Sequence, residues 1–416
     1  MSRMQRREFL SLGAATLAGG VLLRSPLALA RADSGKGRFV LVIMRGALDG
    51  LAAVPPYGDG SYAALRREFA LHAPGGAGGV LPLNGFFGLH PSLGFLGQSY
   101  AAHELIVFHA VASPYRERSH FDGQDVLENG SVKPHALQSG WLNRALAQTP
   151  AAAHRESGVA LGQNVPLVMR GPAAVTSWSP SKLPPLDEDT LARLTDLYAG
   201  DRLLSVRLAD AMAADAIASE DGMVGGMSAA PGAREQSAVP AKDAGARYGE
   251  IVHAAAGFLR QDDGPRVAVF DTSGWDTHAN EGGAEGQLAG RLAALDKGLA
   301  TFKQELGPAW RDTAVLFITE FGRTAAINGT RGTDHGTATV ALLVGGAVDG
   351  GRVIADWPGL SQGALYQGRD LQPTLDLRCV LKGLLEEHLA VPSRALEQSV
   401  FPDSAAAKPL RGLVHT

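Results

Sequence analysis

The sequence predicts an α/β fold: a mostly parallel β-sheet flanked by helices, with at least one antiparallel strand. Five short apolar runs rich in β-branched residues have the composition of strands that are buried on both faces of a sheet. They span residues 38–44, 104–111, 266–271, 313–319 and 339–346. Between the third and fourth runs, large apolar residues recur every three or four positions from Leu288 to Leu306, which is the spacing of an amphipathic helix. A strand, a helix and a strand in this order indicate a parallel crossover unit.

Length and composition fit one large globular domain. The 416 residues are enough for a sizeable core, and 45% of them are hydrophobic, with a mean hydropathy of +0.00. The formal net charge is −4, from 38 basic and 42 acidic residues, which is not the basic excess typical of nucleic-acid-binding proteins. We therefore expect a single domain over residues 36–410 and no nucleic-acid partner. From about 219 to 246 the chain is rich in Gly, Ala, Ser and Pro without periodicity, which predicts a flexible surface excursion.

The N-terminus has the pattern of an export signal. Paired arginines at positions 6 and 7 precede an apolar stretch over residues 9–23, and small residues stand at positions 28 and 30. This order predicts a signal peptide over residues 1–30, and the arginine pair is typical of the twin-arginine pathway. The alternatives are an ordinary secretory signal and an uncleaved anchor, although the apolar stretch is short for a membrane span. We expect a periplasmic or extracellular protein that uses the twin-arginine translocase and has no stable membrane span after cleavage.

Charged and polar residues follow four of the predicted strands. In open α/β sheets, ligands bind beyond the carboxyl ends of the strands, so these four loops predict one site. The candidates are Arg45 and Asp49 after the first strand, Arg118, Ser119, His120 and Asp122 after the second, Asp276 and His278 after the third, and Glu320, Arg323, Asp334 and His335 after the fourth.

The residue types in these loops suit a divalent metal. Asp276 and His278 stand one residue apart after a buried strand, although they are also able to cap a helix or pair with each other. Glu320 continues a buried strand, where a carboxylate needs a cation or hydrogen bonds. Asp49 is either a further acid of the site or a turn former. Ser119 lies at a predicted helix start, where serine commonly caps the helix and where a nucleophile that binds oxyanions is also found.

The strand at 339–346 is expected to run against its neighbours. Glu320 follows its strand and lies at the carboxyl edge, whereas His335 precedes the strand at 339–346. A five-residue strand separates its two ends by roughly 16 Å, so His335 reaches Glu320 only if this strand is antiparallel or if its loop folds back over the edge. A parallel connection usually needs a helix, and the segment between these strands has no helical periodicity. We therefore predict an antiparallel strand, which brings Asp334 and His335 to the site.

Five segments together resemble the domain-of-unknown-function 1501 family, over about residues 38–388. They read RGALDGLAAVPPYGDGSYAALR, RSHFDGQDVLENG, GWDTHANEGG, TEFGRTAAINGTRGTDHG and GGRVIADWPGL. This family is similar to the alkaline phosphatase and sulfatase superfamily. The resemblance therefore implies an alkaline-phosphatase-like domain and a site at the sheet edge. It implies no substrate, because none is agreed for the family.

The resemblance also implies roles for individual residues. Asp49 resembles the acid after the first strand, Ser119 stands in the nucleophile region, and His335 resembles the final histidine. The metal ligands that it implies are Asp49, Asp276, His278, Glu320 and His335. One departure is that Phe321 follows Glu320 where the superfamily has a ligand histidine. Mixed nitrogen and oxygen ligands favour one or two Zn or Mn ions over Ca²⁺.

These observations lead to a hypothesis of an exported, metal-dependent hydrolase of phosphate or sulfate esters. Ser119 and His120 are the catalytic candidates, with Asp122 as another active group of the same loop. Arg45, Arg118 and Arg323 are candidates to bind an anionic small-molecule ester, since guanidinium groups bind such oxygens in pairs. The alternative is a non-catalytic binding or assembly protein on the same fold with a structural or vestigial metal site. A third hypothesis is a metal-independent hydrolase that uses Ser119 and a histidine.

Overall fold

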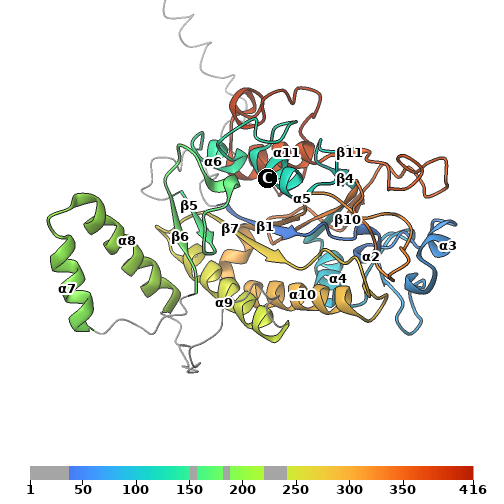
Figure 1. Ribbon diagram of the computed structural model, residues 1–416, viewed down its shortest axis with the longest axis horizontal. Coiled ribbons are helices and arrows are strands. Elements are labelled where there is room, and N and C mark those ends of the chain that lie inside the picture. The colour runs from blue at the N-terminus through green and yellow to red at the C-terminus, as the bar shows by residue number, and fades with distance from the viewer. Residues whose placement is uncertain (1–36, 150–156, 181–187, 220–240, 416) are drawn as a thin grey trace, which may run out of the picture.

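A nine-stranded mixed sheet forms the centre of the molecule in the computed structural model, which describes residues 37–149, 157–180, 188–219 and 241–415 (Figure 1). The order along the sheet is β10-β4-β9-β8-β1-β7-β5-β6, with β11 paired to β4. The strands are β1 (Arg38–Arg45), β4 (Leu105–Ala112), β5 (Gly158–Leu161), β6 (Val175–Trp178), β7 (Val267–Ser273), β8 (Thr313–Ile318), β9 (Thr339–Val344), β10 (Arg352–Ile354) and β11 (Leu375–Asp376). A separate antiparallel pair joins β2 (Leu81–Pro82) to β3 (Gly88–Leu89).

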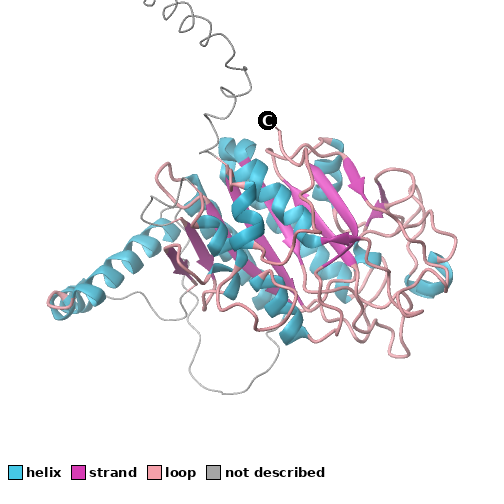
Figure 2. Ribbon diagram, turned by 90° about the horizontal axis from the view of Figure 1, so that it is seen from above, coloured by secondary structure: helices cyan, strands magenta, loops and turns pink. Residues whose placement is uncertain are grey.

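Helices cover both faces of this sheet (Figure 2). They are α2 (Gly50–Ala53), α3 (Tyr62–Arg66), α4 (Gly94–Ala101), α5 (His120–Asn129), α6 (Trp141–Leu146), α7 (Glu188–Tyr198), α8 (Arg202–Ser219), α9 (Ala241–Arg260), α10 (Gln287–Leu306), α11 (Leu377–Leu389) and α12 (Ser393–Ala395). Short helical turns span Arg67–Phe69, Leu167–Met169, Gly307–Asp312 and Leu396–Val400. None of the helices in the described ranges is long and apolar enough to cross a membrane.

The alternation of side chains along β1 explains the three layers. Val40, Val42 and Met44 pack with residues of α4, α9 and α10 on one face. Phe39, Leu41 and Ile43 pack with residues of α6 and α11 on the other. Because successive side chains of a strand point to opposite faces, a strand that is apolar at every position must be covered on both sides. The predicted helical periodicity is confirmed in α10, where all the large apolar residues from Leu288 to Leu306 are buried.

The five predicted strands are all present as β1, β4, β7, β8 and β9, each within two residues of its predicted ends. The predicted mostly parallel sheet with an antiparallel strand is therefore confirmed. Strands β5, β6, β10 and β11 were not predicted, because runs of two to four residues are too short to show a period. The predicted signal peptide lies outside the described residues, as do residues 220–240 of the predicted excursion, whereas residues 241–246 of that excursion belong to α9.

Strand β9 runs antiparallel to both of its neighbours, β4 and β8, as predicted. Strands β7 and β8 are parallel to β1, and β4 shares their direction because it too opposes β9. The carboxyl ends of β1, β4, β7 and β8 therefore meet the amino end of β9 at one edge of the sheet. The loop that precedes β9 starts and ends at this edge.

Helices α7 and α8 form a hairpin that extends away from the sheet beside β6 (Figure 1). Leu197 and Leu203 on this hairpin are largely exposed. The hairpin lies at the opposite end of the sheet from β4 and β9.

A glycine fixes how closely the loop after β8 approaches the start of β9. A Cβ atom at Gly322 would lie 1.9 Å from the carbonyl oxygen of Ala338. We expect Gly322→Ala to lower the free energy of unfolding by about 1–3 kcal/mol, because two backbone segments must separate. Urea unfolding followed by circular dichroism measures this change.

The matched control is Gly290→Ala in α10, where a Cβ atom meets nothing within 4 Å. This control should stabilise the protein by roughly 0.5–1 kcal/mol through helix propensity. Equal unfolding midpoints for the two variants would contradict the close approach.

Candidate metal centre

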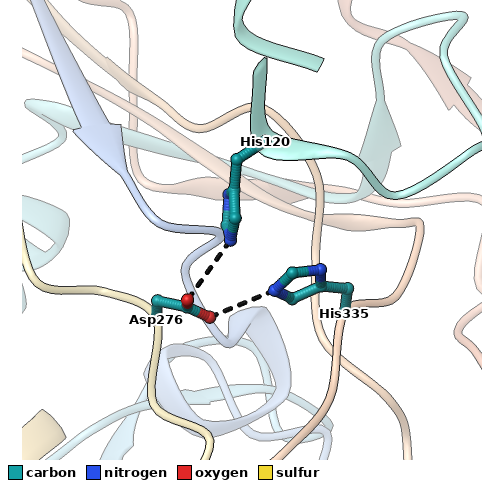
Figure 3. Close-up of side chains that lie close together, drawn as sticks. All are labelled: His120, Asp276 and His335. Carbon is teal, nitrogen blue, oxygen red and sulfur yellow. Dashed lines mark hydrogen bonds and ion pairs between the residues drawn. The ribbon is translucent and has the colours of Figure 1, made fainter. Parts of the chain in front are cut away.

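Three side chains from three separate loops converge beyond the carboxyl edge of the sheet: His120, Asp276 and His335 (Figure 3). His120 is the first residue of α5, after β4; Asp276 follows β7; and His335 precedes β9. One ligand atom from each lies within 4.8 Å of the other two. Nε2 of His120 is 3.4 Å from Oδ2 of Asp276, and Nε2 of His335 is 3.2 Å from Oδ1. All three side chains are partly exposed to solvent.

Glu320 orients His120 and is not itself in a position to bind a metal. It is completely buried, and its Oε1 accepts hydrogen bonds from Nδ1 of His120 (2.8 Å), the backbone nitrogen of Gly46 (2.9 Å) and the side chain of Gln124 (3.1 Å). Its Oε2 accepts from the hydroxyl of Thr319 at 2.8 Å. Glu320 was predicted as a direct ligand; here both of its oxygens accept hydrogen bonds, which satisfy a buried carboxylate.

The pairing of Glu320 with His120 shifts both pKa values. The hydrogen bond that His120 donates to Glu320, together with the charge of Glu320, raises the pKa of His120 despite partial burial. Burial alone would raise the pKa of Glu320, but hydrogen bonds from His120 and Gln124 outweigh it and lower that pKa. Since Nδ1 of His120 carries the proton that Glu320 accepts, Nε2 of the neutral ring presents its lone pair to the site.

Asp276 is held from behind by Arg323. The Arg323 side chain is fully buried, and its Nη1 donates to Oδ1 of Asp276 at 2.6 Å. Its Nε and Nη2 donate to the hydroxyl and carbonyl oxygens of Thr333. Burial would raise the pKa of Asp276, but the hydrogen bond and charge of Arg323 lower it. Arg323 was predicted to bind substrate; the structure instead gives it the role of keeping Asp276 ionised.

His335 and His278 face the same carboxylate oxygen. Nδ1 of His335 donates to the carbonyl oxygen of Arg118 at 2.9 Å, so its Nε2 is directed to the site. Burial and the neighbouring His120 lower the pKa of His335. Nε2 of His278 lies 3.0 Å from Nε2 of His335 and 3.0 Å from Oδ1 of Asp276, while its Nδ1 faces Asp334 at 3.3 Å. The structure thus brings the predicted ligands Asp276, His278 and His335 together.

Asp49 was predicted as a ligand, but it lies behind the site in a buried ion pair. Its carboxylate accepts from Leu51 and Ala52 at the start of α2 and from both Nη atoms of Arg66. Burial opposes ionisation, but the charge and hydrogen bonds of Arg66 lower the pKa of Asp49. The turn-forming alternative for Asp49 is therefore correct, with Arg66 as its partner.

Two of the predicted substrate-binding arginines are also held by carboxylates. Arg45 donates to Glu128 at 2.8 Å and pairs with Asp271. Arg118 pairs with the buried Asp370 at 2.8 Å. Arg45 also donates to the side chain of Gln124, which in turn donates to Glu320, whereas Arg118 is joined to the site through its own carbonyl oxygen.

Ser119 and Phe321 complete the surroundings of the site. Ser119 occupies the N-cap position of α5, but its side chain makes no capping hydrogen bond. Phe321 stacks on His120 with ring centroids 5.0 Å apart and lies 5.3 Å from His335. The phenylalanine in place of a ligand histidine therefore packs against both imidazoles and restricts their rotation.

These residues fit a divalent cation. Nε2 of His120 is buried and has no hydrogen-bond partner. With their Nδ1 atoms facing Arg118 and Asp334, the His335 and His278 rings direct two Nε2 lone pairs at one carboxylate. Acceptor atoms that face one another with no hydrogen between them need a cation or extra protons. Two or three imidazoles and a carboxylate form a donor set of the kind that zinc prefers.

The comparisons with known proteins identify the family. A family model described as "Protein of unknown function (DUF1501)" matches residues 88–400. The chain belongs to the DUF1501 family. This confirms the resemblance predicted from its motifs. No curated protein matches the chain.

Several solved structures are similar to this DUF1501 protein at low sequence identity. A phosphonate monoester hydrolase of Agrobacterium radiobacter is 12% identical, with a TM-score of 0.36 over 76% of this chain and 70% of that one. The C-terminal periplasmic domain of EcEptC from Escherichia coli, in a complex with Zn, is 10% identical, with a TM-score of 0.29 over 75% and 74%. The lipoteichoic acid synthase LtaP from Listeria monocytogenes is 9% identical, with a TM-score of 0.31 over 78% and 67%. At such values, nothing about the activity of this DUF1501 protein follows from these likenesses.

Several residues of the site were not predicted from the sequence. Gln124 lies one helical turn after His120, so the spacing of α5 was a usable signal for it. Three others lie in loops or short helices whose sequences are typical of solvent-exposed segments: Arg66, Glu281 and Asp370. Their contacts depend on how distant loops fold together.

The Glu320–His120 hydrogen bond should control metal affinity. We expect Glu320→Gln to weaken Zn²⁺ binding about 10- to 100-fold, which is the usual effect of losing a carboxylate behind a ligand histidine. Isothermal titration of Zn²⁺ into metal-stripped protein measures the change. The control is Glu305→Gln. The Glu305 carboxylate lies away from the site, and its Oε1 is 3.2 Å from Nδ1 of His253. Equal affinities for the two variants would rule out this role for Glu320.

Proposed function

We propose that this DUF1501 protein is an exported, metal-dependent hydrolase of phosphate or sulfate esters. The observation that carries the proposal is the convergence of His120, Asp276 and His335 from three loops, with their ligand atoms within 4.8 Å of one another. The partly exposed side chains leave the cluster accessible to a small molecule. The predicted signal peptide over residues 1–30 supports export, by the twin-arginine route.

The ion is held by Asp276, His120 and His335, with His278 as a fourth ligand beside them. Nitrogen and oxygen donors together favour Zn²⁺ or Mn²⁺ over Ca²⁺. When bound, such an ion supplies Lewis-acid chemistry, polarising an ester oxygen and lowering the pKa of a bound nucleophile. The protein's contribution is to keep the donors in the required protonation states: Glu320 holds the proton on Nδ1 of His120, and Arg323 keeps Asp276 ionised.

Two arginines next to the cluster supply a site for the anionic group of the ester. The buried Asp370 binds Arg118 through Oδ2 and Arg369 through Oδ1. Arg369 also donates to the carbonyl oxygen of His335, and Arg118 accepts from the His335 ring through its own carbonyl. One carboxylate thus fixes two guanidinium groups beside a ligand histidine. Asp370, Arg118 and Arg369 together carry a net positive charge. A phosphate or sulfate group is the complementary ligand.

The nucleophile is either Ser119 or a water molecule. Ser119 is adjacent to His120, and its hydroxyl makes no capping bond that would hold it to the helix backbone. No side-chain hydroxyl in the described ranges is hydrogen-bonded to the imidazole ring of His120, His278 or His335. A serine–histidine pair that acts without a metal therefore has no support in the observed hydrogen bonds.

A second candidate function is a binding or assembly protein with a structural metal site. Phe321 favours it, because a phenylalanine that packs on two ligand imidazoles replaces a ligand with an apolar contact. Such a protein binds metal and anions but does not turn over an ester. Turnover measurements separate the two candidates.

Hydrolysis should depend on the ion and on Asp276. We expect a generic aryl phosphate or aryl sulfate to be hydrolysed, with activity lost on chelation and restored by Zn²⁺ or Mn²⁺. Asp276→Asn should lower kcat/KM by more than about 100-fold, because it removes the charged ligand. This is a larger loss than the one expected for a residue that only hydrogen-bonds to a ligand. His135→Ala, at an exposed histidine that faces Asp122 and Asp125 on α5, is the control and should keep full activity.

Ser119→Ala in the same assay assigns the nucleophile. Loss of turnover with unchanged metal content assigns the attack to Ser119, and retained turnover assigns it to water. Metal binding without turnover of any phosphate or sulfate ester would favour the binding protein.

Arg369 should recognise the negative charge of the substrate. We expect Arg369→Gln to raise KM for an anionic ester about 10-fold or more, since a hydrogen bond to a charged group contributes about 1.5–3 kcal/mol. Steady-state kinetics with a charged and an uncharged ester of the same leaving group test this, because only the charged ester should be affected. The matched control is Arg311→Gln, an exposed arginine that precedes β8 at the other edge of the sheet. An equal change for both esters would contradict charge recognition.

A further inference from the structure

A buried glutamate joins the two loops that carry the ligands. Glu281 has no exposed surface, and its Oε2 accepts hydrogen bonds from the hydroxyls of Thr277 (2.8 Å) and Thr333 (2.7 Å). Thr277 stands between Asp276 and His278, and Thr333 stands two residues before His335. A single oxygen atom therefore connects the loop after β7 to the loop before β9.

The same contact extends to the ligand Asp276 through Arg323. The Thr333 hydroxyl donates to Glu281 and accepts from Nε of Arg323 at 3.1 Å. Nη2 of Arg323 donates to the Thr333 carbonyl, and its Nη1 donates to Asp276 at 2.6 Å. A continuous chain of hydrogen bonds thus runs from Glu281 to the metal-binding carboxylate. Displacing Glu281 would remove the acceptor that orients the Thr333 hydroxyl, and this hydroxyl in turn holds Nε of the guanidinium that positions Asp276.

The second oxygen of Glu281 requires a proton. Oε1 is buried with no hydrogen-bond donor beside it, and Asp49 is the acid whose charge acts most strongly on Glu281. Two carboxyl groups share a hydrogen bond only when one of them is protonated. Asp49 is ionised by Arg66, so the proton belongs to Glu281: burial and the Asp49 charge raise the pKa of Glu281 to about 8. The charged or titratable groups that act on Glu281 are Asp49, Arg66 and Tyr62.

We propose that Glu281 is a positioning residue: as a neutral carboxylic acid it joins the loops of Asp276 and His335 and holds their side chains at a metal-binding separation. It donates through Oε1 to Asp49 and accepts through Oε2 from Thr277 and Thr333. The inference rests on the proposed metal site and adds a residue that does not touch the ion. A glutamine has the same two functions, because its amide donates where the acid proton does and its carbonyl accepts where Oε2 does.

The test compares Glu281→Gln with Glu281→Ala by titrating Zn²⁺ into the full-length, metal-stripped protein. We expect Glu281→Gln to retain wild-type affinity and Glu281→Ala to weaken it about 10- to 100-fold, as for other outer residues of metal sites. Glu305→Ala removes a partly buried carboxylate that faces His253, and should leave the affinity unchanged. If Glu281→Ala does not fold, Thr277→Val, which loses the hydroxyl, is compared with Thr277→Ser, which keeps it; only the valine variant should bind Zn²⁺ weakly.

The pH dependence of stability distinguishes a neutral acid from a carboxylate. The pKa of Glu281 is raised in the folded protein above its ordinary value of 4.5. Its stabilising contribution is therefore complete below about pH 4.5 and is lost as the pH rises through about 8. In metal-free protein, the Tm of wild type minus the Tm of Glu281→Gln should fall steadily over that range, because the other titrating groups are common to both proteins.

The outcomes separate this inference from the proposed function. If the wild-type protein binds no Zn²⁺, the metal site is ruled out, and this inference is ruled out with it. Wild-type binding together with unchanged affinity in Glu281→Ala overturns the inference alone. Weakening of Glu281→Gln to the level of Glu281→Ala, or a Tm difference that does not vary with pH, shows that Glu281 acts as a charged carboxylate and also overturns it.

Discussion

Every carboxylate that is buried or partly buried at the carboxyl edge of the sheet must have a partner, and the structure of the site depends on this constraint. The cost of an unpaired charge in an apolar interior is large, so each acid has its own partner. Glu320 is bound to His120, Asp49 to Arg66, and Asp276 to Arg323. Glu281, next to Asp49, keeps a proton instead. Because each partner comes from another loop, satisfying the charges also fixes the relative positions of the loops.

The direction of β9 determines which residues this constraint brings together. An antiparallel β9 places the end of the preceding loop beside the carboxyl ends of β4 and β8. His335 thereby reaches His120, which follows the neighbouring strand β4, and Asp276, which follows β7 on the other side of β9. Gly322 and Gly336 allow the two arms of this loop to approach, since a Cβ atom at either would contact backbone within 2.5 Å. Chain direction and close backbone approach are thus as necessary to the site as the ligands themselves.

The sequence was sufficient to predict the elements and the edge at which the site lies, but not the role of each charged residue. Buried strands and the α10 periodicity are local patterns, and the reversal of β9 followed from the lack of a helical pattern in the segment that precedes it. Asp276, His278 and His335 were correctly grouped, because they follow or precede strands that share an edge. Asp49 and Glu320 were assigned as ligands because nothing local distinguishes an acid that binds a metal from one that binds a side chain. The partner of Glu320 is 200 residues away in the sequence, and that of Asp49 is 17 residues away, at the end of α3.

The spacing of His120, Asp276 and His335 along the chain has a consequence for when the site can exist. No two of these residues lie within one helix, strand or turn, so no fragment of the chain contains a preformed site. All the central strands must pair before the donors meet, and pairing over such long sequence separations is slow compared with local folding. An ion that binds only the finished arrangement stabilises it by mass action. On the proposed metal site, uptake of the ion would therefore follow the pairing of these strands and would report that the fold is assembled.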